Sequence, residues 1–135
     1  MGKQVYRAYR SLLDSERVRR IEALGGRMQR LLWASTSTKD PLAPDTMYVS
    51  GLAAPLTVNT MPDATLLAFF DHGRLEGLLP DDGGDCDAML ERFAAAGIDV
   101  KALAQRLQAD GAKAFVDSWT QLLGVISAQS ARVST

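Results

Sequence analysis

The sequence predicts an α/β fold in which two short parallel strands alternate with helices, and in which most of the chain is helical. Two apolar runs, "RLLWAS" and "LTVNTM", are too short for helices and are bounded by glycine, proline or polar residues, as is typical of strands covered on both faces. Around them, apolar residues recur at intervals of three or four, which indicates amphipathic helices. Alternation of strands with helices is the pattern of a parallel sheet.

Residues 1–25 are predicted to be helical, because "KQVYRAYRSLL" and "DSERVRRIEALGG" both place apolar residues at helical spacing. Ser15 is a plausible cap, so the region forms either two helices or one helix broken near Asp14. The later elements are predicted as follows: strand 29–34, short helix 45–53, strand 56–61, helix 62–73, C-terminal helices within 85–128 and a frayed tail at 129–135. Residues 1–128 are expected to form one domain.

Single residues within these elements have simple structural interpretations. Pro62 suits the first turn of a helix, and Gly111 is a candidate break in the long C-terminal helical segment. His72 ends a predicted helix, where an imidazolium is favoured by the negative helix terminus. Trp33 and Trp119 lie in apolar patterns and are expected in the core.

The charge is unevenly distributed, with nine Lys and Arg against three Asp and Glu in residues 1–39 and the opposite excess after them. The arginines of "ERVRRIEAL" lie on the helix face opposite its apolar residues, and no base-reading motif accompanies them, so no nucleic-acid partner is expected. No apolar run approaches the roughly 18 residues of a membrane span, and the N-terminus has no apolar signal segment. We therefore expect a cytoplasmic chain without a membrane partner, a metal or a cofactor.

Three blocks, "RLLWASTSTKDP", "DTMYV" and "LTVNTMPDATLLAFFDHG", resemble the last two strand–helix units of the transaldolase family. The resemblance covers about residues 6–125 and is to the large bacterial subfamily related to transaldolase/glucose-6-phosphate isomerase fusions. It implies the C-terminal portion of a (β/α)8 TIM-type barrel, with strands seven and eight, their helices and extra C-terminal helices. The chain departs from the subfamily at three positions: Met28 replaces a common Pro, Ser37 a common Gly and Leu56 a common Asp.

The resemblance also suggests a phosphate site, because TIM barrels often bind phosphate after strands seven and eight. Ser35 matches a serine of the family, and Lys39 lies where other subfamilies place an arginine. Hydroxyls donate to phosphate oxygens and a lysine complements their charge. Ser35 and Lys39 are thus the phosphate-binding candidates, and further substrate-site rim candidates are Thr36, Asn59 and Thr60. The alternative, in which the hydroxyls only turn the chain and Lys39 is solvated, stays open.

The family binds its donor sugar to a strand lysine as a Schiff base. The four lysines here are Lys3, Lys39, Lys101 and Lys113, and none lies in a predicted strand. The resemblance therefore implies transfer of a dihydroxyacetone unit between sugar phosphates, in the pentose phosphate pathway, but no catalytic residue within this chain. The isolated chain is predicted to be inactive as a transferase.

Several functions remain open at this point. The chain can be a truncated or split transaldolase, whose partner is a complementary N-terminal barrel chain or a fused isomerase domain. It can also be a degenerate self-associating fragment, a non-catalytic sugar-phosphate-binding or regulatory subunit, or an unrelated helical interaction domain. Because two strands leave open edges, the isolated chain is expected to self-associate.

Overall fold

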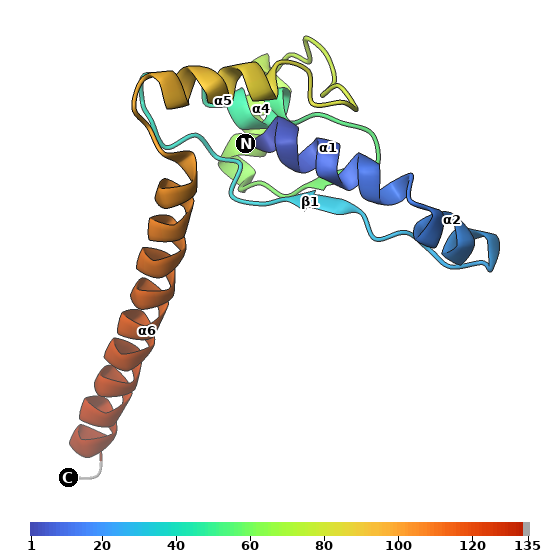
Figure 1. Cartoon of the computed structure of the whole chain (residues 1–135). Helices are drawn as coiled ribbons and strands as arrows, with labels where there is room; N and C mark the ends of the chain where they lie inside the picture. The colour runs from blue at the N-terminus through green and yellow to red at the C-terminus, as the bar shows by residue number, and fades with distance from the viewer. Residues whose placement is uncertain (134–135) are drawn as a thin grey trace. The chain divides into compact units, whose positions relative to one another are not determined.

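A computed structural model of the chain describes residues 1–133 and divides into two compact units, Met1–Asp87 and Ala88–Thr135 (Figure 1). The elements follow the predicted order: α1 (Gly2–Leu13), α2 (Glu16–Ala23), β1 (Leu31–Trp33), α3 (Met47–Gly51), β2 (Thr57–Asn59), α4 (Asp63–His72), α5 (Cys86–Ala95) and α6 (Val100–Val133). The chain is thus mostly helical, with one small sheet.

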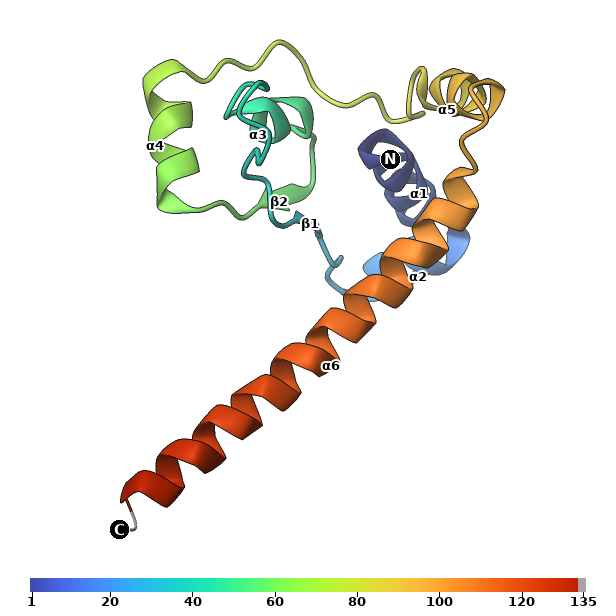
Figure 2. The same cartoon turned by 90° about the vertical axis from the view of Figure 1, so that its left-hand side faces the viewer.

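The sheet consists of β1 and β2, which pair in parallel and are joined through α3 (Figure 2). Leu32 lies opposite Val58 in the register. The parallel pairing is confirmed, although both strands are shorter than the predicted ranges. Leu56 explains this in part, because its φ of 60° excludes it from β2, whereas Ser35, with a φ of 56°, lies just beyond the predicted range of the first strand. A residue with positive φ cannot continue an extended strand.

The N-terminal region forms two helices rather than one. Asp14 and Ser15 separate them, and the Ser15 Oγ accepts a hydrogen bond from the Val18 N–H at 3.4 Å. Ser15 has extended backbone angles, as expected for an N-cap. The predicted cap therefore decides between the two alternatives.

Two tyrosines of α1 hold the segments that lead into the strands. The fully buried Tyr6 donates from its hydroxyl to the Pro55 carbonyl at 3.4 Å and to Asp81 Oδ1 at 3.2 Å. The Tyr9 hydroxyl donates to the Gln29 carbonyl at 3.2 Å and to the Leu56 carbonyl at 3.1 Å. Burial, and secondly the charge of Asp81, raise the pKa of Tyr6. Because Gln29 and Leu56 precede β1 and β2, α1 fixes the amino-terminal ends of both strands.

The basic residues of α1 pair with aspartates of the segment that leads from α4 into α5 and of the first turn of α5 (Figure 2). Helical spacing of three and four residues places the cations on one face of α1. The ion pairs are Lys3–Asp85, Arg7–Asp87 and Arg10–Asp81. We call these residues the α1 charge ladder.

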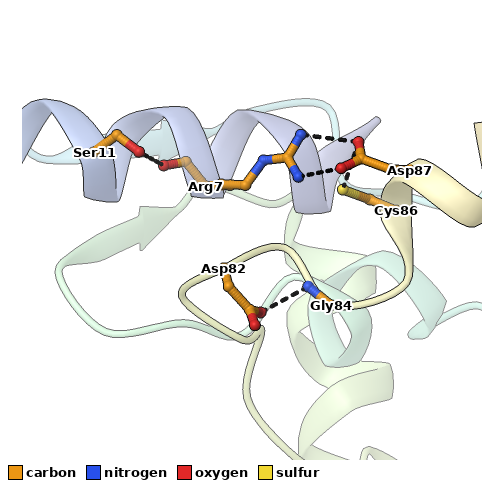
Figure 3. Close-up of polar contacts among 6 residues, drawn as sticks. All are labelled: Arg7, Ser11, Asp82, Gly84, Cys86 and Asp87. Carbon is orange, nitrogen blue, oxygen red and sulfur yellow. Dashed lines mark hydrogen bonds and ion pairs between the residues drawn. The ribbon is translucent and has the colours of Figure 1, made fainter.

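The central pair of the ladder is bidentate (Figure 3). The two terminal nitrogens of Arg7 donate to the two carboxylate oxygens of Asp87 at 2.6 and 2.9 Å, and this hydrogen bonding lowers the pKa of Asp87. The neighbouring Cys86 is buried, and its thiol donates to Asp87 at 3.6 Å. The Gly84 N–H donates to Asp82 at 2.8 Å, which closes the turn before α5.

The core of the described residues is small and lies within Met1–Asp87. Its buried side chains are the apolar Tyr6, Val18, Val49, Leu79 and Cys86 and the polar Thr36, Thr46 and Thr65. Leu32 of β1 remains about half exposed. The sheet is therefore only partly covered by the helices of its own unit.

In the second unit, α6 differs from the prediction in two respects. It is continuous through Gly111 and extends to Val133, so residues 129–133 of the expected tail are helical, while 134–135 lie outside the described residues. One glycine costs only about 1 kcal/mol relative to alanine, which the flanking ion pairs Arg106–Asp110 and Lys113–Asp117 help to offset.

The expectation that Trp119 belongs to the core is also wrong. Its side chain is 61% exposed, and α6 contains no buried residue. The apolar pattern around Trp119 marks one face of α6, but a face contributes to a core only where another element packs on it. None of the helices in the part of the chain that the structure describes is long and apolar enough to cross a membrane.

Candidate active-site rim at the strand ends

The carboxyl ends of β1 and β2 lie side by side, and hydrogen bonds continue between the chains that leave them. The backbone N–H of Thr60 donates to the Trp33 carbonyl at 2.9 Å, and the Thr60 hydroxyl donates to the same oxygen at 3.1 Å. The loop that begins at Ser35 is therefore anchored beside the segment that leads into α4.

Thr36 joins the two strand ends directly. Its side chain is only 2% exposed, and its hydroxyl lies 2.7 Å from Asn59 Oδ1 and 3.1 Å from the Thr60 carbonyl oxygen. A threonine hydroxyl has one proton, so these two acceptors share it. The structure thus brings together the three residues that the sequence placed on one rim. Since the hydroxyl of Thr36 is already engaged, the contacts indicate that Thr36 positions this rim.

Ser35 has a different environment from Thr36. It is exposed, its φ of 56° lies in the left-handed region, and among residues 1–133 no group is hydrogen-bonded to its hydroxyl. A non-glycine residue in this region costs on the order of 1 kcal/mol, and such residues are concentrated at functional sites. Ser35 therefore combines a strained backbone with a free hydroxyl at the carboxyl end of β1.

Lys39 is also exposed, and its ammonium donates to Ser37 Oγ at 2.7 Å. Ser37 therefore supplies an acceptor for the lysine. The Thr38 hydroxyl donates to the Pro44 and Asp45 carbonyls at 2.8 and 3.2 Å, which closes the loop on itself. Of the four consecutive hydroxyls, those of Thr36 and Thr38 are hydrogen-bonded within the protein, and that of Ser37 accepts from Lys39.

His72 is a further residue of this region, and sequence reasoning interpreted it only as a helix end. Its Nε2 lies 2.9 Å from Asp45 Oδ1, and its Nδ1 lies 3.1 Å from Asp71 Oδ2. The hydrogen bond to Asp45 raises the pKa of His72, and the same contact lowers the pKa of Asp45. The pair links the end of α4 to the loop after β1. The only sequence signal was a histidine at the end of a helix, and its partner is 27 residues away.

The exposed polar groups at this rim are hydrogen-bond donors. The rim offers a free hydroxyl at Ser35 and an ammonium at Lys39. The described strands contain no lysine, because Lys3 lies in α1 and both Lys101 and Lys113 lie in α6. An amine that forms a Schiff base must be neutral part of the time, which desolvation in a strand favours and an exposed helix does not.

Comparison with known proteins identifies relatives of the chain. The family described as Transaldolase/Fructose-6-phosphate aldolase matches residues 1–126. A transaldolase of Frankia alni is 46% identical over 135 residues, which are 99% of this chain and 36% of the relative. A transaldolase of Neisseria meningitidis serogroup A is 43% identical over 123 residues, 91% of this chain and 35% of the relative.

A transaldolase of Acidothermus cellulolyticus is similar to the same extent, at 43% identity over 127 residues, 93% of this chain and 34% of the relative. The chain thus spans about a third of the length of the curated relatives it matches. The family match covers nearly all of its residues, including both strands and the loop between Ser35 and Lys39. The chain belongs to the transaldolase/fructose-6-phosphate aldolase family.

Proposed function

We propose that this chain forms the last two strand–helix units of a transaldolase-type (β/α)8 barrel and binds the phosphate group of a sugar phosphate at Ser35 and Lys39. The observation that carries the proposal is the free Ser35 hydroxyl at the carboxyl end of a parallel strand, beside neighbours whose hydroxyls are already bonded. In a TIM barrel the carboxyl ends of the strands form the active-site face.

The proposed contacts fit the chemistry of a phosphate group. A hydroxyl and an ammonium both donate hydrogen bonds to its oxygens, and bonds to a charged group contribute about 1.5–3 kcal/mol each. Lys39 is held near the loop by Ser37, and Thr36 holds the start of the loop against β2. Asn59 and Thr60 complete the rim, where a sugar hydroxyl is the natural ligand.

The transfer reaction needs groups that this chain does not supply. We propose that a complementary chain with the six other strands carries the Schiff-base lysine, and that the joined barrel transfers a dihydroxyacetone unit between sugar phosphates. The relatives are about three times as long as the matched segment, which leaves room for those strands. Alone, the chain is a sugar-phosphate-binding piece without transferase activity.

Phosphate binding is tested by thermal melting in inorganic phosphate at constant ionic strength. A ligand that binds only the native state raises Tm. We expect Ser35→Ala and Lys39→Met each to remove most of the shift, whereas Lys101→Met, an exposed lysine of α6, leaves it unchanged. An equal shift in wild type and Lys39→Met would show that this lysine is simply solvated.

Transfer is tested by adding the part of the Frankia alni transaldolase that this chain does not match. Closing the barrel would place the phosphate loop opposite the lysine, so turnover should appear only in the mixture. Ser35→Ala should chiefly raise KM, because a remote phosphate contact binds ground state and transition state alike. If neither this partner nor the corresponding segments of the other relatives restored turnover, the chain would instead be a degenerate fragment.

A non-catalytic, self-associating protein is the second candidate, and the exposed apolar face of α6 favours it. Phe115, Trp119 and Ile126 are spaced four and seven residues apart, which places them on one helix face, and each is more than half exposed. Contiguous exposed apolar surface commonly marks an association site. Sedimentation velocity decides the point: a concentration-dependent oligomer supports association, and a monomer at all concentrations excludes it.

A further inference from the structure

A hollow lies at the amino-terminal ends of the strands, opposite the ends that carry Ser35 and Lys39. It has a volume of about 650 Å³ and is formed where α1 and α2 meet the chain that leads into β1. Arg30 directly precedes β1 and Leu56 directly precedes β2, and both line it. Tyr9, which also lines it, bonds the backbone at both strand starts, so the floor of the hollow is held in place.

Positive charge predominates around this hollow. Four arginines line it against two carboxylates. The arginines are Arg10, Arg19, Arg27 and Arg30, and the carboxylates are Asp14 and Glu22. Counting four guanidinium groups against two carboxylates, the lining carries a formal net charge of about +2 at neutral pH.

The internal ion pairs leave part of this charge uncompensated. Arg19 pairs with Asp14 at 3.3 Å. Within residues 1–133, no carboxylate comes within ion-pair distance of Arg27 or Arg30. Arg10 contacts Asp81 through one terminal nitrogen at 3.0 Å, but its Nε is buried and has no hydrogen-bond partner among the described residues.

We propose that this hollow binds a small molecule with two phosphate groups, or an inorganic diphosphate, at a site separate from the Ser35–Lys39 loop. Arg27 and Arg30 line the hollow without a carboxylate partner among residues 1–133, so their donors can bond the phosphate oxygens of a ligand. The guanidinium fork of an arginine matches two phosphate oxygens at once. The volume lies in the usual range of small-molecule sites and exceeds what one phosphate fills.

Strand geometry separates the two sites. Arg30 precedes β1 and Ser35 follows it, so the three residues of the strand, each rising about 3.3 Å, lie between the arginines and the phosphate loop. Loss of one site is therefore expected to leave the other intact.

The test is isothermal titration of the full chain with inorganic pyrophosphate, at constant ionic strength set with chloride. We expect saturable binding to wild type at one arginine-dependent site. The double variant Arg27→Gln/Arg30→Gln should bind at least tenfold more weakly. The matched control is Arg20→Gln, an exposed arginine of α2 outside this hollow, which should bind as wild type. Arg10 is left unchanged because it pairs with Asp81.

The same titration with Ser35→Ala/Lys39→Met separates this site from the phosphate loop. Unchanged pyrophosphate affinity in that variant supports the arginine site, whether or not Ser35 and Lys39 bind phosphate. Three results would overturn the proposal: no saturable binding to wild type, equal weakening in Arg20→Gln, or loss of binding only in Ser35→Ala/Lys39→Met. Melting curves of every variant confirm that each remains folded.

Discussion

Thr36→Val is the substitution that most directly probes how the rim is held together. Thr36 is buried, and its hydroxyl is the only side-chain group that bonds both Asn59 and the Thr60 carbonyl in the described structure. Valine has nearly the same shape, so the substitution removes the hydroxyl without opening a cavity. The effect therefore measures the hydrogen bonding between the two strand ends.

The magnitude follows from the environment of the two acceptors. One shared proton corresponds to one hydrogen bond, worth about 0.5–1.5 kcal/mol net. Asn59 is half-buried and Thr60 is exposed, so water replaces part of the lost bonding. We expect a loss of about 0.5–1.5 kcal/mol in the free energy of unfolding, equivalent to a fall in Tm of roughly 2–12 °C for a unit of this size.

Urea unfolding followed by tryptophan fluorescence measures this loss within the first unit. Trp33 lies in β1 and Trp119 in α6, so the work is done in a Trp119→Phe background in which Trp33 is the only reporter. Thr36→Ser is the matched control, because it keeps the hydroxyl. If Thr36→Val were as stable as wild type, or if Thr36→Ser lost as much stability as Thr36→Val, the hydroxyl would not hold the rim.

The remaining predictions concern backbone strain and charge. Leu56→Asn should raise the free energy of unfolding by about 1 kcal/mol in a melting experiment, because asparagine tolerates the positive φ and Leu56 is already 54% exposed. The control is Leu66→Asn, which changes a residue of 53% exposure within α4 and should not stabilise the chain. His72→Ala should lower Tm most at about pH 5–6 and should leave it unchanged at about pH 9. The pKa of His72 is higher in the folded than in the unfolded chain, so protonated His72 stabilises the folded state below the unfolded value near 6.5. This stabilisation is lost as the pH rises through the folded pKa. Below about pH 4 protonation of its aspartate partner should remove the effect as well, because the lowered pKa of that group stabilises only above its folded value. Arg7→Glu should lower Tm at low salt, and adding Asp87→Arg should restore it by re-forming the pair in reverse; lack of rescue would remove this pair from the charge ladder.

Local patterns predicted the elements and their order, because apolar periodicity and caps act over a few residues. The Ser15 cap separated α1 from α2, and the apolar runs became parallel strands. The start of the second strand was predicted one residue too early because nothing in the residue type of Leu56 indicates a positive φ. The sequence expectation that Gly111 breaks a helix failed because one glycine is a small penalty in a helix of 34 residues.

Contacts between distant residues could not be predicted in the same way. The sequence placed Thr36, Asn59 and Thr60 on one rim because carboxyl ends of parallel strands meet, and the structure brings them together. The pairing of His72 with Asp45 depends on how α4 returns to the loop, which no local pattern encodes. The exposure of Trp119 shows the same limit, since an apolar face indicates a core only if something covers it.

Borohydride trapping with fructose 6-phosphate tests the central claim most directly. We propose that this chain supplies the phosphate-binding end of the barrel and that a complementary chain supplies the lysine. In the mixture with the unmatched part of the Frankia alni transaldolase, mass spectrometry should find the reduced adduct on that partner and none on this chain. An adduct on Lys39, or on any other lysine of this chain alone, would contradict the account.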